Sequence, residues 1–355
     1  MEIAICEATS CRREALTVAV VALDGDVLVP VDSRKGIPGQ LETIANVAGH
    51  LGALVKNGHR LVITHGNASQ VGYMLLRGEV ARHVIHSLPL DICGADTQGA
   101  TGYMLQQALC NWFSRQGLDQ EVATLVTQVV VGEPAPPGAP CTKGIGPFFD
   151  WERAQALINN HKWEFDMVPG HGYQRIVPCL TPKKIVEARS IRNLFDNGAV
   201  VICAGGGGIP VRALPPPSLP FREGLGVGRG ELEGGLVGIE AVVDKAYTAE
   251  LLAEVVQAKT ILFVSPWERI VETFHLSLVD KLHRIDLSNL DSLIEQSSNM
   301  EDTMRHKLII SRHFLLEDGR SVFFLPPDQL GAVPHDCSGV LLQRSAISYQ
   351  LKPDC

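Results

Sequence analysis

The sequence predicts an α/β protein whose mostly parallel sheet is covered by helices on both faces. Short apolar runs alternate with stretches of helical periodicity, which is the pattern of strands joined by crossover helices. With 355 residues, 45% of them hydrophobic, the chain is long enough for one large α/β domain with a subdomain, or for two domains. We expect a single domain over residues 1–355 that carries two insertions.

The first half of the chain supplies strands for the centre of the sheet. Residues 16–23 (LTVAVVAL) form a continuous apolar run that suits a buried parallel strand. Apolar residues recur every three or four positions from 41 to 55, which predicts a helix that ends before Gly58. The next expected elements are a strand over 60–64, a helix over 97–116 and a strand over 122–131.

Two segments read as insertions. Residues 133–140 (EPAPPGAP) exclude regular structure because proline lacks the amide hydrogen and fixes φ. With the aromatic-rich stretch that follows, they predict a protruding subdomain over 132–178. Residues 213–231 predict a Pro/Gly-rich loop without a core of its own.

The alternation continues between and after these insertions. Thr181 and Pro182 predict the start of a helix that ends before Gly198, since threonine caps helices and proline suits a first turn. The remaining expected elements are strands over 199–204, 237–243, 260–264, 320–325 and 339–342, with helices over 248–258 and from about 288.

Composition limits the classes of partner. A formal net charge of −8 argues against a general nucleic-acid or anionic-membrane binder. The nine cysteines include no CxxC pair, which is typical of free thiols in a reducing compartment. Residues 1–13 lack an apolar core, and no apolar run approaches membrane-spanning length. We therefore expect a cytoplasmic protein.

Three predicted strands end in glycine-containing turns. These turns contain Gly25, Gly66 with Asn67, and residues 205–208. Ligands of open α/β sheets bind beyond the carboxyl ends of strands, and glycine lets the backbone approach an anion. The alternative is that the glycines merely end strands. No GxxxxGK[ST] motif occurs, and Pro210 replaces the third glycine of GxGxxG, so a P-loop and a dinucleotide fingerprint are excluded.

Two lysines lie beside such turns. Lys143 belongs to a glycine-containing stretch of the predicted subdomain, and Lys245 follows Asp244 at the end of a predicted strand. An isolated lysine is usually a solvated surface residue, but a lysine at a strand end is a candidate phosphate contact. Phosphoryl transfer requires such positioned charges. The turns and lysines together predict a small-molecule phosphotransferase.

A series of motifs resembles those of carbamate kinases, in the same order, over roughly residues 15–265. They are 64–67 (THGN) with 70–72 (QVG), 89–99 (PLDICGADTQG), 102–107 (GYMLQQ), 122–128 (VATLVTQ), 142–147 (TKGIGP), 175–178 (RIVP), 204–211 (AGGGGIPV) and 238–245 (GIEAVVDK).

The resemblance implies the amino-acid-kinase fold, a three-layer α/β/α sandwich with a mostly parallel sheet and a protruding subdomain. It implies reversible phosphoryl transfer between ATP and carbamate, giving carbamoyl phosphate and ADP, with ATP or ADP and Mg²⁺ as cofactors. The implied partners are these small molecules and a second copy of the chain in a homodimer, with no nucleic acid and no membrane.

The resemblance also implies roles for particular residues. Lys143 would reach in from the subdomain, Lys245 would lie beneath the transferred phosphoryl group, and Asp244 would orient the lysines or organise the metal. Ser265 would contact the nucleotide, and no side chain is assigned as a resident metal ligand. The substrate and phosphate cradle would comprise Gly25, Gly66, Asn67, Gly205, Gly206, Gly207 and Gly208.

Several positions depart from the family pattern. The first turn reads ALGGN in the family but ALDGD here, which places Asp24 and Asp26 at a phosphate site. Two like charges about 4 Å apart repel by about 4 kcal/mol at an effective dielectric constant near 20. An extra magnesium ion would offset this repulsion, as would side chains that turn away. Ala68 and Ser69 also replace a glycine and a proline.

The segments that bind the nucleotide in the family differ even more in this sequence. Residues 265–267 (SPW) replace a Thr-Asp pair, and the family's GSMxPK segment has only 297–300 and Lys307 as nearest candidates. Three hypotheses follow: a working carbamate kinase, a non-catalytic relative that binds or regulates, and a kinase for another small carboxylate or carbamate. A non-catalytic relative is expected to bind ADP poorly.

Overall fold

The structure is a computed structural model of the chain. It describes residues 18–344 except 31, 33–34, 82, 87, 133–141, 215–234, 277–280, 297–301, 318 and 335–336. Residues 1–13, most of the predicted loop insert and residues 297–300 therefore lie outside the described part. Within that part, no helix has the length and apolar character needed to cross a membrane.

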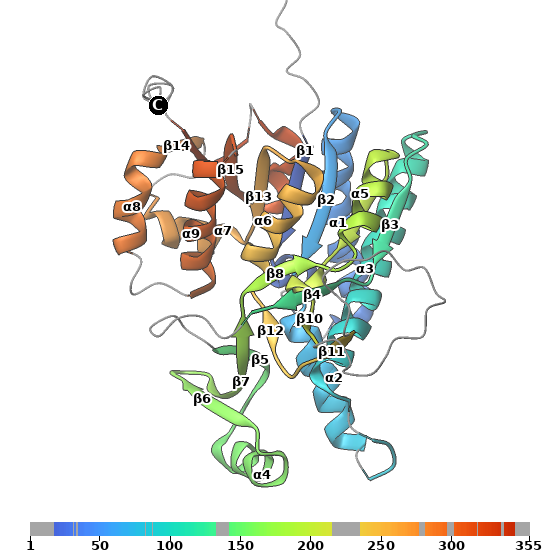
Figure 1. Cartoon of the computed structure of the whole chain (residues 1–355), viewed down its shortest axis with the longest axis vertical. Coiled ribbons are helices and arrows are strands. Elements are labelled where there is room, and N and C mark those ends of the chain that lie inside the picture. The colour runs from blue at the N-terminus through green and yellow to red at the C-terminus, as the bar shows by residue number, and fades with distance from the viewer. Residues whose placement is uncertain are drawn as a thin grey trace, which may run out of the picture.

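A mostly parallel sheet forms the centre of the main body (Figure 1). Its eight described strands run in the order β14-β16-β15-β13-β1-β2-β9-β3, and only β15 and β16 are antiparallel neighbours. The predicted fold class is thereby confirmed. The strands are β1 (Val18–Leu23), β2 (Arg60–His65), β3 (Val122–Leu125), β9 (Val200–Cys203), β13 (Thr260–Val264), β14 (Leu282–Asp286), β15 (Ser321–Leu325) and β16 (Gly339–Gln343).

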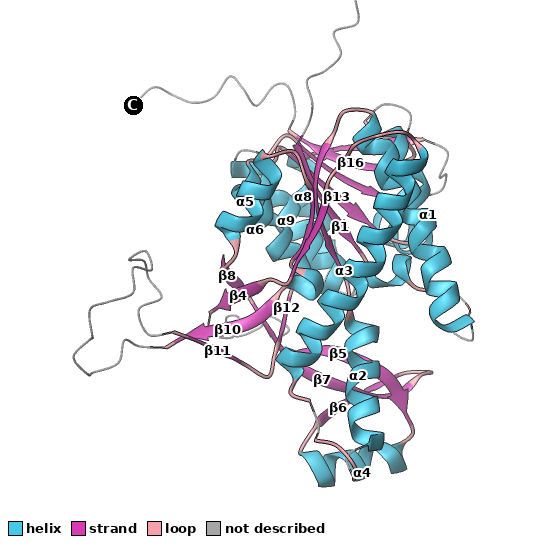
Figure 2. Ribbon diagram, turned by 90° about the vertical axis from the view of Figure 1, so that its right-hand side faces the viewer, coloured by secondary structure: helices cyan, strands magenta, loops and turns pink. Residues whose placement is uncertain are grey.

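Helices cover both faces of this sheet (Figure 2). Alternate residues of a strand point to opposite faces, so Val21 and Leu23 of β1 join one core while Val20 and Ala22 join the other. One core contains α1 (Gly36–Lys56) and α3 (Leu90–Arg115), with the 3-10 helix Pro327–Ala332; the other contains α5 (Ala188–Asp196), α6 (Lys245–Val256), α7 (Trp267–Phe274), α8 (Leu287–Gln296) and α9 (Asp302–Glu317).

Two smaller sheets lie beyond the carboxyl ends of the central strands. One has the order β11-β10-β4-β8, and the other is β12-β7-β5 with β6 paired to β7. Strands β5 to β7 and helix α4 project from the main body, and α2 packs on β5 (Figure 1). These elements are α2 (Ala68–Ala81), β4 (Gln128–Val131), β5 (Thr142–Phe149), α4 (Trp151–His161), β6 (Glu164–Val168), β7 (Gly172–Leu180), β8 (Pro182–Ile185), β10 (Ile209–Ala213), β11 (Leu236–Gly238) and β12 (Val242–Val243).

Three sequence-based element assignments are wrong. The stretches 122–131 and 237–243 each contain two strands that belong to different sheets. Residues 182–185 form strand β8, and the helix begins only at Ala188. The signal was ambiguous because proline also suits the first residue of an edge strand. Strand β8 lies at the edge of its sheet, where it pairs with β4.

Candidate active site

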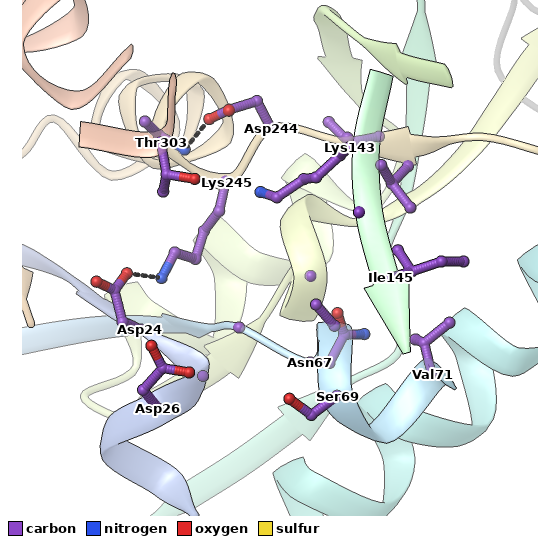
Figure 3. Close-up of a pocket in the computed structure, with 18 of the residues that line it drawn as sticks. Asp24, Asp26, Asn67, Ser69, Val71, Lys143, Ile145, Asp244, Lys245 and Thr303 are labelled. Carbon is purple, nitrogen blue, oxygen red and sulfur yellow. Dashed lines mark hydrogen bonds and ion pairs between the residues drawn. The ribbon is translucent and has the colours of Figure 1, made fainter. Parts of the chain in front are cut away.

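A cavity of about 470 Å³ lies beyond the carboxyl ends of the central strands (Figure 3). The turns after β1 and β2 form one side of it, and the residues that join β12 to α6 form another. Strand β5 of the projecting part closes it from across the cleft, and α7 and α9 also contribute residues. Segments far apart in the sequence therefore meet at one cavity.

The first two glycine turns touch one another through their backbones. Gly66 donates its amide to the carbonyl oxygen of Leu23 at 2.8 Å. A Cβ atom built on Gly66 would lie 2.5 Å from the amide nitrogen of Gly25. Because backbone atoms cannot move aside as a flexible side chain does, this approach requires glycine at position 66.

The third turn has a left-handed backbone. Ala204 adopts φ 50°, and residues 206–208 have φ between 69° and 96°. A Cβ on Gly206 would lie 2.2 Å from the side-chain oxygen of Asn67. Asn67 in turn donates to the hydroxyl of Thr97 at 2.9 Å. The glycine run thus allows the turn to pack directly on the asparagine that sequence analysis singled out.

Gln98 of α3 holds this third turn in place. Its amide donates to the carbonyl oxygens of Gly205 and Thr127, and its side-chain oxygen accepts the Thr127 amide at 2.8 Å. The hydroxyl of Thr127 accepts the amide of Ala204 at 3.0 Å. Gln98 lay inside a recognised motif, yet the sequence alone did not reveal this supporting role.

The two predicted lysines approach the cavity from different directions (Figure 3). Lys143 extends from β5, whereas Lys245 is the first residue of α6 and only 8% exposed. Burial lowers the pKa of Lys245 to about 8, although the nearby Asp24 carboxylate opposes that shift. At neutral pH the protonated form still dominates, so the site retains this positive charge.

Asp244 caps helix α6 and is positioned by a histidine. Its carboxylate accepts the Ala246 amide at 2.8 Å and contacts Nδ1 of His306 at 2.8 Å. Burial acts to raise the pKa of Asp244, but the His306 hydrogen bond and the charge of Lys143 outweigh it and hold the pKa at about 2. Asp244 is therefore ionised and pinned at the entrance to the helix.

Asp24 is the centre of a buried charge cluster. It is 4% exposed, and its Oδ1 accepts Lys245 Nζ at 2.8 Å while its Oδ2 accepts Lys307 Nζ at 2.7 Å. The Ser265 hydroxyl donates to Oδ2 at 2.6 Å. Burial acts to raise the pKa of Asp24, but the charges and hydrogen bonds of the two lysines outweigh it and lower the pKa far below its ordinary value.

The charge of Asp26 is balanced by an arginine rather than by the two lysines. Its Oδ2 accepts Nη2 of Arg269 at 2.8 Å, and Nη1 of the same guanidinium lies 3.4 Å from Asp24. Both aspartates of the altered turn are thus paired with cations. The sequence suggested that an extra magnesium ion or side chains that turn away would offset their repulsion. The side chains do not turn away, since both line the cavity, and pairing with Lys245, Lys307 and Arg269 offsets the repulsion instead.

The structure brings most of the predicted site residues to one place. Those that line the cavity are Lys143, Lys245, Asp244, Gly25, Gly66, Asn67 and Gly206. Gly205, Gly207 and Gly208 form the rest of the third turn behind the cavity surface. Ser265 is fully buried behind Asp24; its contact with a nucleotide stays a prediction.

Three charged residues of the site were missed or left unassigned. Lys307, named only as a nearest candidate, is 1% exposed and belongs to the cluster. Arg269 and His306 gave no motif signal, because each acts through a contact with an aspartate distant in sequence. The position of Arg269 soon after a strand end could have marked it as a site residue. Its pairing with Asp26 becomes visible only in the fold.

The fold and the cavity define a class of protein, an α/β sandwich with a cavity of lysines and glycine turns beyond the carboxyl ends of its strands. The model of the Amino acid kinase family matches residues 17–325. The chain therefore belongs to the amino acid kinase family, and within it the chain is carbamate kinase-like.

The similar proteins support this placement. The chain is 31% identical over 303 residues to a carbamate kinase of Pyrococcus horikoshii, covering 85% of this chain and 91% of the relative. It is 34% identical over 316 residues to the carbamate kinase-like protein YahI of Escherichia coli, covering 88% and 94%. A structure of Giardia lamblia carbamate kinase bound to AMP-PNP has a TM-score of 0.75 at 26% identity, covering 93% and 99%.

Proposed function

We propose that the protein transfers a phosphoryl group reversibly between ATP and a small carboxylate-type acceptor, with carbamate as the first candidate. One observation carries the proposal: Lys143 and Lys245 reach the same cavity from the projecting part and from the main body, beside three glycine turns. A carbamate or carboxylate acceptor and the phosphates of a nucleotide are all anions, and a cavity of about 470 Å³ lined by lysines has room and charge for both. The relatives named carbamate kinase favour carbamate among such acceptors.

The roles follow from the chemistry of phosphoryl transfer. Catalysis there rests on positioning and on stabilising charge. Backbone amides of the turns at Gly25 and Gly66 would bind oxygens of the ligand, and Lys143 and Lys245 would stabilise its negative charge. Asp244, ionised and held by His306, would keep Lys143 aligned by charge attraction.

The nucleotide and Mg²⁺ enter as substrates together. The AMP-PNP complex of the Giardia lamblia relative supports a nucleotide ligand. Within the described residues, no group of three or more His, Cys, Asp or Glu side chains has the arrangement of a metal site. Mg²⁺ commonly binds through substrate phosphates and only one or two carboxylates, so these residues fit an ion that arrives with the nucleotide. When bound, it would neutralise phosphate charge. A cytoplasmic homodimer is part of the same proposal.

A specific observation favours a second candidate function, that of a non-catalytic binding or regulatory protein. The Asp24 carboxylate already pairs with Lys245 and Lys307 inside the site. In addition, Ser265 and Pro266 stand where carbamate kinases have a Thr-Asp pair. Both features would weaken binding of a phosphorylated ligand. The two candidates therefore differ in whether turnover occurs at all.

The test is ATP formation from carbamoyl phosphate, ADP and Mg²⁺. Lys143→Ala and Lys245→Ala are each expected to lower the rate by about 10²-fold or more, since each removes a charge that stabilises the transition state. Lys184→Ala, an exposed change on strand β8, is the matched control and should retain the wild-type rate. Wild-type turnover no higher than that of the two lysine variants would refute the enzyme proposal and favour the binding protein.

A further inference from the structure

The hydrogen-bond donors of Lys307 are fully used inside the protein. An ammonium group has three N–H donors. Those of Lys307 face Asp24 Oδ2 at 2.7 Å, the Ser265 hydroxyl at 2.9 Å and the sulfur of Met304 at 3.6 Å. Only 1% of its surface is exposed. Although Lys307 lines the cavity, its ammonium has no N–H left for a ligand while these contacts persist.

Lys245 is partly committed in the same way. Its ammonium donates to Asp24 Oδ1 at 2.8 Å and also to the carbonyl oxygen of Leu23. These two contacts use two of its three donors. A ligand in the cavity therefore meets Lys245 through at most one N–H, although the side chain lines the cavity.

The carboxylate that binds these lysines has the shape of part of a phosphoryl group. Its two oxygens each accept an ammonium, and Oδ2 also accepts the Ser265 hydroxyl at 2.6 Å. Charge-assisted hydrogen bonds of this length are the contacts that lysines make with phosphate oxygens. Asp24 thus offers the lysine pair the oxygens and the negative charge that an anionic ligand would otherwise supply.

We propose that Asp24 is an internal anion that occupies the place of a phosphoryl group between Lys245 and Lys307. The inference rests on the proposed function only in assigning Lys245 to a phosphate site; Lys307 is added by its contact with Asp24 and its place in the cavity lining. A phosphorylated ligand gains Lys307 only by displacing the Asp24 carboxylate. Asp24 is therefore the residue that sets the affinity of this cavity for phosphate.

Binding of inorganic phosphate tests this directly. Titration calorimetry in a chloride buffer would compare the wild type with Asp24→Asn and Asp24→Gly, and thermal shifts with rising phosphate would be measured in parallel. Both variants remove the negative charge, and glycine also vacates the space. We expect phosphate to bind at least about tenfold more tightly to each variant, because two buried cations lose their internal partner.

Asp26→Asn is the matched control. It removes the same charge from the same turn, but Asp26 is paired with Arg269 and its side chain is 53% exposed. Its effect on phosphate affinity should stay below about threefold, since screening by water weakens exposed charges. An equal gain in Asp24→Asn and Asp26→Asn would show a general charge effect and overturn the inference.

The outcomes separate this inference from the proposed function. Tighter phosphate binding in the Asp24 variants supports the internal anion even if no variant forms ATP, which would refute only the enzyme proposal. Unchanged or weaker phosphate binding overturns the internal anion whatever the turnover. If Asp24→Gly does not fold without phosphate, Asp24→Asn decides, because asparagine keeps the shape of the side chain and its hydrogen bond with Ser265.

Discussion

Replacing Lys307 by methionine is expected to destabilise the protein strongly. Lys307 is buried and lies 2.7 Å from Asp24, so the attraction between the two charges is about 6 kcal/mol at an effective dielectric constant of 20. Desolvation of the two ions offsets much of that attraction, yet removal of one partner leaves the other charge buried, which typically costs about 3–5 kcal/mol. Asp24 keeps Lys245 and Ser265, so we expect about 3 kcal/mol.

Equilibrium urea unfolding measures this change. Methionine matches the length of the lysine stem, and Lys56→Met, at the exposed end of α1, is the control, with an expected change within about 0.5 kcal/mol. Combining Lys307→Met with Asp24→Asn should cost less than the sum of the two single changes, by about 1–3 kcal/mol. A loss below about 1 kcal/mol for Lys307→Met, at an unchanged denaturant slope, would refute the charge cluster.

Three further predictions concern the turns, the subdomain and pH. Gly66→Ala should destabilise the protein and weaken phosphate binding, because the new Cβ would lie 2.5 Å from the Gly25 amide; Gly99→Ala, with no atom within 4 Å, should be neutral or stabilising in its helix. Gly72→Ala would place a Cβ 1.8 Å from the backbone of β5 and force α2 away from that strand. Limited proteolysis should therefore cleave the projecting part faster than in wild type. Phosphate affinity should fall as pH rises through about 8, where Lys245 loses its proton, and Lys245→Met should abolish that step in a calorimetric pH series.

The backbone plan of the site could be predicted from the sequence. Strand ends at Leu23, His65 and Cys203 lead into glycine turns, and their apolar runs and glycines are local signals that need no tertiary information. The two lysines were located by their place beside such turns. The turn from 205 to 208 was expected and is present in its left-handed form.

The charge cluster could not be predicted in the same way. Whether Asp24 faces a ligand or a lysine depends on α9, which begins more than 270 residues later. The double strands at 122–131 and 237–243 were missed for a related reason. Each stretch crosses from one sheet to another at only one or two polar or glycine residues, too short an interruption to mark two strands. Local patterns identify strands, but they do not assign a strand to a sheet or a carboxylate to its cation.

The Asp24 cluster also changes what the site does for the folded state. Functional sites commonly cost a protein some stability, because activity can require a strained or destabilised arrangement. Here one carboxylate joins the first strand of the sheet to α6 and α9 through Lys245 and Lys307. The region that would bind phosphate therefore also connects an N-terminal strand to two C-terminal helices through buried ion pairs. A sequence change that frees these lysines for phosphate therefore also removes contacts that hold β1, α6 and α9 together.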